Sequence, residues 1–348
     1  MSPPDAPLRL ILDGDALVAN WRWLAKAGGR ASCGAAVKAD GYGLGAKGVV
    51  QRLAAAGCRD FFVATWAEVA ALGEWPEGLS LSVLHGVRDA DMAFARASGA
   101  RPVLNSAGDV RRWKAAGGGA CDVMLDTGMN RLGLSPEEAR SGLLDGIEIS
   151  TLMSHLACAD EDHAMNEAQL FTFRGLKGAI PAARYSLANS AGVCLGARYS
   201  FGLTRPGLAL YGGVPRAEAQ GHIRPVVNIQ AQVIQRRRVP AGATVGYGAT
   251  FTATRPTEVA ILNIGYADGY LRAFSGGKGC ARAGGTRLAV LGRVSMDLTA
   301  VDAGAAPDLA EGDWVSIDYD LAETAGLSGL TQYELLTLLG RRYQRRWV

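Results

Sequence analysis

Short apolar runs alternate with helix-like segments over the first two hundred residues or so of the chain. These runs read as buried strands, and helical patterns lie between most of them. The runs cover residues 37–38, 62–65, 81–85, 102–105, 123–126, 149–155, 185–189 and 201–205. About eight strand-plus-helix units close a parallel barrel, whereas an open dinucleotide-binding sheet needs about six. The pattern therefore predicts an α/β fold with a (β/α)8 TIM-like barrel over residues 11–224.

The pattern changes near Pro225. From Val226 onward the apolar runs are short and often alternate with polar residues, and turns containing glycine or proline separate them. This alternation is typical of strands with one buried face. We therefore predict a mainly β C-terminal domain over residues 225–348, joined by the N-terminal strand 1–10. The spacing of apolar residues over 331–342 predicts a final helix.

One lysine stands out because it ends an apolar run and enters a glycine-rich turn. The chain has six lysines, and only Lys38 occupies such a position. Active sites of parallel barrels lie at the carboxyl ends of the strands, so Lys38, His155, Asn189, Ser190 and Arg205 are expected at one mouth. Desolvation there disfavours the ammonium form, so the amine can act as a nucleophile and form a Schiff base with an aldehyde.

The turn after Lys38 also permits a second interpretation. Gly41, Gly43 and Ala46 fit the G-x-G-x-x-A pattern of dinucleotide-binding proteins. In that fold an acidic residue ends the next strand and binds a ribose. Asp60 instead precedes the next apolar run, which disfavours this alternative.

Composition narrows the choice of partners and compartment. The chain has 36 basic and 33 acidic residues, so its charge indicates neither a nucleic acid nor a membrane surface as partner. The first residues lack the pattern of a signal peptide, no later run could span a bilayer, and six scattered cysteines fit reduced thiols, so we predict a cytoplasmic protein. His155, Cys158, Asp160 and His163 match no compact metal site, and no metal is predicted.

Seven segments rich in glycine and polar residues follow one another along the chain. They are VKADGYG (37–43), LDTGMNRLG (125–133), SHLACAD (154–160), ANSAG (188–192), RPGLALYG (205–212), IGYADG (264–269) and GRVSMD (292–297). In this order they resemble the motifs of the alanine racemase family. The resemblance implies an enzyme that uses pyridoxal 5'-phosphate (PLP), with the cofactor in the barrel and a second base on the β domain. It also implies a homodimer with shared active sites, because in the family the equivalents of Tyr266 and Met296 come from the neighbouring subunit.

The resemblance also assigns roles to individual residues. Racemisation removes the α proton on one face and returns a proton on the other, which two bases on opposite faces achieve. Lys38 is expected to hold the cofactor and to act as one base, and Tyr266 as the other. His155 is expected to contact Tyr266 and to link to Arg205, which would pair with the pyridine nitrogen. The other expected cofactor contacts are Tyr42, Asn189, Ser190, Gly207, Leu208 and Tyr333, and the expected substrate contacts are Arg131, Met296 and Asp297.

One position departs from the family pattern. The family often has a lysine, modified to a carbamate, seven residues before the arginine that Arg131 matches, and Met124 stands there instead. A methionine carries no negative charge, so either Arg131 is held another way, for example by an added anion such as chloride, or its orientation differs.

Taken with the resemblance, the sequence predicts a racemase that interconverts L-alanine and D-alanine and supplies D-alanine for peptidoglycan. The alternatives are a racemase of broader or serine preference and a non-catalytic PLP-binding carrier. A decarboxylase is disfavoured because such enzymes pair the pyridine nitrogen with a carboxylate, where this chain has Arg205.

Overall fold

The computed structural model describes residues 6–348, which fall into two compact units. One unit covers residues 16–224, and the other combines the segment up to Asp15 with residues 225–348. Of the N-terminal strand expected over residues 1–10, residues 1–5 lie outside the described residues, and the strand observed is β1 (Leu8–Leu12). Within the described residues, no helix is long and apolar enough to cross a bilayer.

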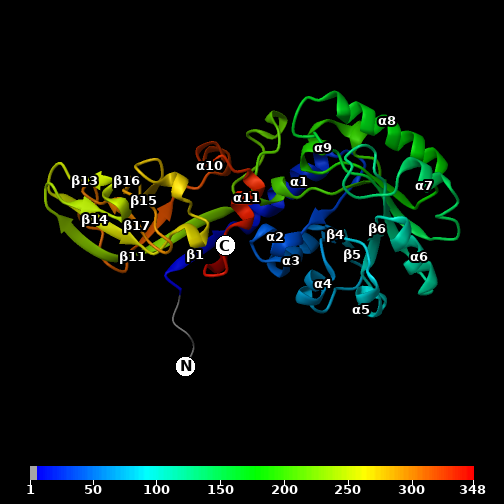
Figure 1. Ribbon diagram of the computed structural model, residues 1–348, viewed down its shortest axis with the longest axis horizontal. Helices are drawn as coiled ribbons and strands as arrows, with labels where there is room; N and C mark the ends of the chain where they lie inside the picture. Colours follow the sequence, from blue (N-terminus) through cyan, green and yellow to red (C-terminus); the bar gives the residue numbers. More distant parts are fainter. Residues whose placement is uncertain (1–5) are drawn as a thin grey trace. The chain divides into compact units, whose positions relative to one another are not determined.

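The first unit is a parallel barrel (Figure 1). Its strands are β2 (Ser32–Cys33), β3 (Ala35–Ala36), β4 (Asp60–Val63), β5 (Ser80–Val83), β6 (Arg101–Leu104), β7 (Cys121–Met124), β8 (Ile149–Met153), β9 (Arg184–Ser186) and β10 (Leu203–Thr204). Strands β3 to β9 form one parallel sheet in sequence order. Strand β10 pairs with β2, and just after it the Arg205 amide donates to the Ala188 carbonyl beyond β9 at 2.8 Å. These bonds close the ring, which confirms the predicted barrel and excludes the open dinucleotide-binding sheet.

Gly34 lies where the first barrel strand passes from β2, which pairs with β10, to β3, which pairs with β4. A Cβ at this position would lie 2.9 Å from the Asp60 carbonyl oxygen and 3.2 Å from that of Thr204. These oxygens belong to the neighbouring strands on either side, and real Cβ atoms are rarely this close to backbone. The barrel therefore closes tightly at a point that only glycine allows.

Helices lie outside the parallel strands (Figure 1). They are α1 (Gly14–Ala27), α2 (Lys38–Tyr42), α3 (Ala46–Ala56), α4 (Trp66–Leu72), α5 (Met92–Ser98), α6 (Ala107–Ala115), α7 (Pro136–Arg140), α8 (Ala164–Ala179) and α9 (Ser190–Cys194). Several begin at a side chain that accepts a bond from the first turn, namely Thr65, Ser106, Ser135 and Asn189. Such caps satisfy amide donors that the helix leaves unpaired, so they fix where each helix starts after its strand.

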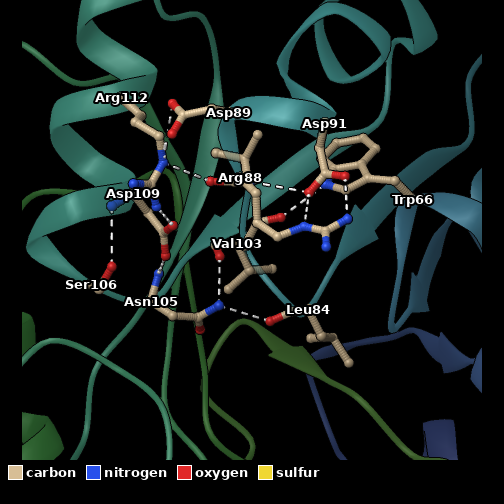
Figure 2. Close-up of polar contacts among 12 residues, drawn as sticks. Trp66, Leu84, Arg88, Asp89, Asp91, Val103, Asn105, Ser106, Asp109 and Arg112 are labelled. Atoms are coloured by element: carbon tan, nitrogen blue, oxygen red, sulfur yellow. Dashed lines mark hydrogen bonds and ion pairs between the residues drawn. The ribbon is translucent and has the colours of Figure 1, made fainter.

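Polar side chains hold together the loops that follow β5 and β6 (Figure 2). The Asn105 amide nitrogen donates to the carbonyls of Leu84 and Val103, both at 2.9 Å. The Asp109 carboxylate accepts from the Asn105 backbone at 3.0 Å and pairs with Arg112 at 2.8 Å. Asn105 and Asp109 are both buried. The carboxyl ends of these strands are therefore held by specific bonds at the mouth of the barrel.

An ion pair joins two strands that are not neighbours in the barrel. Arg184, at the start of β9, binds both oxygens of Asp60, at the start of β4, at 2.9 and 2.5 Å. Ser80 donates to the same carboxylate at 2.8 Å. The Arg184 guanidinium and the Ser80 hydroxyl keep the pKa of Asp60 below its usual range although burial opposes this. The charge is compensated at the amino ends of the strands, opposite the mouth.

The second unit is built on an antiparallel sheet with one parallel pair at its edge (Figure 1). The sheet order is β14-β17-β16-β15-β18-β11-β1-β19. The elements are β11 (Val227–Val239), β12 (Thr244–Val245), β13 (Phe251–Thr252), β14 (Thr257–Leu262), β15 (Cys280–Ala283), β16 (Thr286–Leu291), β17 (Thr299–Asp302), β18 (Trp314–Ile317), β19 (Gln344–Trp347), α10 (Leu321–Ser328) and α11 (Gln332–Thr337). Strand β11 shifts register after Val233 and pairs with β14 as well as with β1 and β18.

The end of the chain differs from the prediction. The helix expected over 331–342 ends at Thr337, and the chain then turns into β19, which pairs in parallel with β1. The apolar spacing continued past the helix because Leu339 is buried in the turn and Tyr343 at the start of the strand. This turn brings Arg342 into contact with Asp268, in the segment that carries Tyr266.

Candidate active site

Lys38 begins a turn with an unusual backbone. It lies two residues after the end of β3, as expected at a strand end, and the next four residues, Ala39 to Tyr42, all have positive φ, between 52° and 63°. For residues other than glycine this conformation costs roughly 1–2 kcal/mol each. Glu68 accepts from the Ala39 amide at 2.6 Å, and Asp40 accepts from the Ala46 amide at 2.8 Å. The Glu68 side chain of α4 and the Asp40 side chain of the turn itself, which binds the start of α3, therefore hold the strained turn that presents the lysine.

The Lys38 amine lies in partly buried surroundings with a positive neighbour. Burial lowers its pKa below the usual lysine value, and the Arg131 guanidinium lowers it further, while Glu68 opposes the shift. A lower pKa increases the fraction of neutral amine, which is the nucleophilic and basic form. The lysine at this strand end is therefore suited to form a Schiff base and to exchange protons.

Tyr42 and Gly207 lie against each other. The Tyr42 ring stacks on that of Tyr211 with centroids 4.6 Å apart, and the Tyr211 hydroxyl donates to the Ala36 carbonyl at 2.8 Å. A Cβ at Gly207 would collide with the Tyr42 hydroxyl. Ser190 lies on the same loop cluster, because its Oγ accepts from the amides of Gly207 and Ala209 at 2.9 and 3.2 Å. The structure thus groups four expected cofactor contacts, Tyr42, Ser190, Gly207 and the buried Leu208.

Asn189 has a structural task beside this cluster. Its side chain caps α9 by accepting from the Gly192 amide at 2.8 Å. The cap sets the position of Ser190, which is the first residue of that helix. Asn189 therefore acts on the cluster through the backbone it fixes.

Arg205 places a buried positive charge at the end of β10. Its side chain is 6% exposed, and it donates through Nη1 to Ser186 Oγ and through Nη2 to the Ser154 carbonyl, the latter at 2.5 Å. Ser186 in turn donates to the Leu203 carbonyl at 2.6 Å, so its lone pairs face the arginine. Burial lowers the pKa of Arg205 to about 10, which leaves the group charged at neutral pH. The positive charge is thus fixed in one orientation.

His155 lies near this charge. Burial, and then the positive charges of Arg205, Arg131 and Lys38, lower the pKa of His155 to about 3, so the imidazole is neutral near pH 7. In the described part of the chain no hydrogen bond joins His155 to Arg205, whose donors go to serines. Gln169 holds the His155 backbone by donating to its carbonyl at 2.9 Å.

Arg131 lies on an exposed loop without a fixed partner. The Asp126 carboxylate accepts from the amides of Gly128 and Met129 at 2.8 and 2.9 Å, which shapes the loop. No hydrogen bond or ion pair to the Arg131 side chain occurs among residues 6–348, although its charge acts on Lys38 and His155. Met124 is buried at the end of β7. Met124 therefore packs a strand end, and no hydrogen bond or ion pair within residues 6–348 fixes the orientation of the Arg131 guanidinium.

The remaining expected residues lie in the second unit. Tyr266 starts a short 3-10 helix, Tyr266–Asp268, and its side chain is 39% exposed, with the Arg272 guanidinium 5.8 Å from the ring centroid. Met296 is 53% exposed on the next loop. The Asp297 carboxylate pairs with Arg342 at 2.6 Å. Tyr333 lies on α11 and is also exposed.

Several residues that support these groups were not predicted. Ser186 orients Arg205, Gln169 holds the backbone at His155, and Arg342 binds the turn that carries Tyr266. None of them lies in a motif that the sequence singled out as chemical. Only the position of Ser186, three residues before Asn189 at a strand end, offered a signal.

Comparisons with known proteins decide the family. The alanine racemase N-terminal domain family matches residues 12–215, and the alanine racemase C-terminal domain family matches residues 226–347. The chain belongs to the alanine racemase family. This confirms the resemblance of the seven motifs, and the family's two domains correspond to the barrel and the mainly β unit.

Relatives of the alanine racemase family match the chain over nearly its full length. The catabolic alanine racemase of Agrobacterium fabrum is 44% identical, over 97% of this chain and 92% of the relative. The biosynthetic alanine racemase of the same organism is 40% identical, over 99% and 94%. Among solved structures, the alanine racemase of Bartonella henselae with covalently bound pyridoxal phosphate is 35% identical, with a TM-score of 0.90 over 99% of this chain and 100% of that one.

Proposed function

We propose that this chain is a PLP-dependent racemase that interconverts L-alanine and D-alanine. The mouth of the barrel carries the proposal, because a lysine with a lowered pKa and a buried, oriented arginine lie at the ends of its first and last strands. Membership of the alanine racemase family and the 40–44% identity to alanine racemases support it. The solved relative that carries covalent pyridoxal phosphate supports the choice of cofactor.

The residues at the mouth fit this cofactor. Gly207 has no room for a side chain because the Tyr42 hydroxyl lies against its backbone, so glycine at this position lets two proposed phosphate contacts lie side by side. We assign the phosphate to Tyr42, Ser190, Gly207, Leu208 and Tyr333, with Asn189 holding the helix of Ser190. Arg205 would hold the pyridine nitrogen and, being charged, would leave it unprotonated. When bound, PLP attaches the substrate amine and delocalises the charge left on the α carbon.

The two bases have separate tasks in the proposed reaction. Lys38 Nζ exchanges a proton with the α carbon on one face, and the Tyr266 phenol oxygen does so on the other. The lowered pKa of Lys38 favours its neutral, basic form. Arg131 is the group proposed for the substrate carboxylate, and Met296 with Asp297 would line the substrate site. Neutral His155 has one donor and one acceptor nitrogen, so it would either donate a hydrogen bond to the phenol or accept one from it.

We also propose a homodimer in which each copy completes the site of the other. Tyr266 and Met296 are 39% and 53% exposed on one chain, which leaves them accessible to a second copy. The proposed role is cytoplasmic supply of D-alanine for peptidoglycan. Size-exclusion chromatography with light scattering tests the dimer, and a monomer that racemises alanine at full rate would contradict the shared site.

An absorbance spectrum and chiral product analysis test the activity. We expect a band from the lysine-linked cofactor and, with L-alanine, approach to equal L and D forms. Lys38→Ala should lose the band, while Lys47→Ala, an exposed lysine on α3, should keep it. If the cofactor band is present but no D-alanine forms, serine and other amino acids should be tested next, and then a carrier function. Retention of the band in Lys38→Ala would contradict the assigned lysine.

The role of Tyr266 needs a separate test. Tyr266→Phe removes only the hydroxyl, so the cofactor band should remain while racemisation falls by about 10²–10⁴-fold, the usual effect of losing a general base. Tyr247→Phe is the matched control, because Tyr247 is 65% exposed in the same unit. Equal rates for wild type and Tyr266→Phe in both directions would exclude the two-base mechanism.

A further inference from the structure

The turn that carries Tyr266 is bound to an arginine near the end of the chain. Asp268 closes this turn, and its side chain is 1% exposed. Arg342 binds both of its oxygens, with Nε at 2.7 Å from Oδ1 and Nη2 at 2.8 Å from Oδ2. The third nitrogen, Nη1, lies 2.6 Å from Oδ1 of Asp297. Because the guanidinium is planar and rigid, bonds from all three nitrogens fix the geometry between the two carboxylates.

These two carboxylates belong to two loops, the Tyr266 turn (residues 265–269) and the Met296 loop (residues 292–298). The amides of Tyr266 and Ala267 donate to the carbonyls of Ser295 and Met296, each at 3.0 Å. A Cβ at Gly265 would collide with the Met296 carbonyl, so the two backbones are in close contact. Arg342 therefore adds a charged link to loops that already share backbone bonds.

The buried carboxylate depends on this link. Asp268 Oδ2 also accepts from the Gly265 amide at 3.0 Å, and the Tyr343 hydroxyl donates to the Asp268 carbonyl at 2.8 Å. Arg342 itself is 49% exposed, so its loss opens no core cavity but leaves a buried charge without its counter-ion. The expected response is a rearrangement of the Tyr266 turn.

We propose that Arg342 is a positioning residue that fixes Tyr266 for proton transfer by binding Asp268 and Asp297 together. This inference rests on the proposed function, because the position of the Tyr266 phenol affects the rate only if Tyr266 acts as a base. Arg342 contacts neither the phenol nor the proposed cofactor residues through any bond seen in the described part of the chain.

Amide hydrogen exchange of the holoenzyme gives the first test. In Arg342→Ala the amides of Tyr266 and Ala267 should exchange about tenfold faster, because a charge-assisted link of their turn is lost. Arg341→Ala is the matched control, since this neighbouring exposed arginine has no hydrogen bond or ion pair within residues 6–348. Arg342→Lys keeps the positive charge but not the planar guanidinium. Its exchange rates should fall between those of the wild type and Arg342→Ala. Unchanged exchange in Arg342→Ala would overturn the proposal.

Isotope incorporation separates positioning from general damage. In D2O, Lys38 can remove and return the α hydrogen on its own face, which incorporates deuterium with retention, whereas racemisation also needs Tyr266. Arg342→Ala should lower racemisation by about tenfold and raise the ratio of retained exchange to racemisation for one enantiomer. Loss of folded protein would lower both rates equally and leave the ratio unchanged. An unchanged ratio would therefore also overturn the proposal.

A double-mutant cycle with Asp268→Asn closes the test. If Arg342 acts through Asp268, the double variant should exchange no faster than the worse single variant, whereas independent effects would multiply. If the increases in exchange rate of the two single variants multiply in the double variant, Arg342 does not act through Asp268. If Tyr266→Phe retained full racemisation, the proposed two-base function would fail, while the exchange measurements would still decide whether Arg342 holds the turn.

Discussion

The two proposed bases stand in opposite surroundings. Lys38 follows a buried strand, and burial together with the Arg131 charge lowers its pKa. Tyr266 stands 39% exposed on a turn that backbone bonds and Arg342 hold in place. The barrel therefore prepares both the position and the acidity of Lys38, and bonds within the second unit fix the position of the turn that carries Tyr266. We expect the polar surroundings of the phenol to come from the barrel mouth of another copy.

Arg205 and Arg342 differ in their surroundings in the same way as the two proposed bases. Arg205 is buried and oriented by a serine hydroxyl and a carbonyl, whereas Arg342 is half-exposed between two carboxylates. Changes around Arg205 should therefore alter cofactor binding and the stability of the barrel. Changes around Arg342 should alter the rate with the cofactor still in place.

Among changes that leave both proposed bases in place, the largest expected effect comes from Gly207→Ala, which probes the barrel side. The new methyl group would collide with the Tyr42 hydroxyl, and overpacking of this kind costs about 1–3 kcal/mol. We expect PLP to bind about ten- to hundredfold more weakly, as measured by the absorbance remaining after dialysis. In Gly202→Ala the methyl group would be 3.6 Å from its nearest neighbour, an ordinary contact, so binding should not change. Equal retention in both variants would contradict a crowded phosphate site.

Ser186→Ala tests whether the orientation of Arg205 matters. The change leaves Arg205 Nη1 and the Leu203 carbonyl without their buried partner, so the free energy of unfolding should fall by about 1–3 kcal/mol. The rate of racemisation should fall by about tenfold, because the arginine can turn away from the cofactor. Ser186→Thr keeps a hydroxyl and should recover most of both quantities. Urea unfolding and initial rates measure the two effects, and wild-type values in Ser186→Ala would show that Arg205 needs no such support.

Alternation of strands and helices was enough to predict the barrel, and the ends of its strands gave the proposed place of the site. Lys38 and Arg205 could be found because each ends a strand-like run. The left-handed turn after Lys38 could not be predicted, since Ala39 and Tyr42 carry no sequence signal for positive φ. Arg342 could not be predicted either, because its partners lie 74 and 45 residues away and its segment resembled a continuing helix.

The pH dependence of barrel stability tests whether the pKa of His155 is lowered in the folded chain. Its pKa is lowered from 6.5 to about 3, so between these values the unfolded chain binds the proton and the folded chain does not. Stability should therefore be lost as the pH falls through this window, and His155→Gln should lose less. His85→Gln, an exposed histidine, should keep the wild-type slope. Thermal unfolding at about pH 7 and about pH 5 measures the difference. An unchanged slope in His155→Gln would show that the imidazole is not kept neutral by burial.

The smallest expected effect comes from Asp297→Asn, a change in the second unit near Tyr266. The Asp297 side chain is 52% exposed, and ion pairs of this kind contribute about 0–1 kcal/mol, so the free energy of unfolding should change by less than about 1 kcal/mol. Because Arg342 keeps both bonds to Asp268, exchange of the Tyr266 amide should rise less than in Arg342→Ala. If Asp297 also lines the substrate site, KM for alanine should rise while kcat stays near wild type. A fall in kcat as large as that of Arg342→Ala would instead move the main hold on Tyr266 from Asp268 to Asp297.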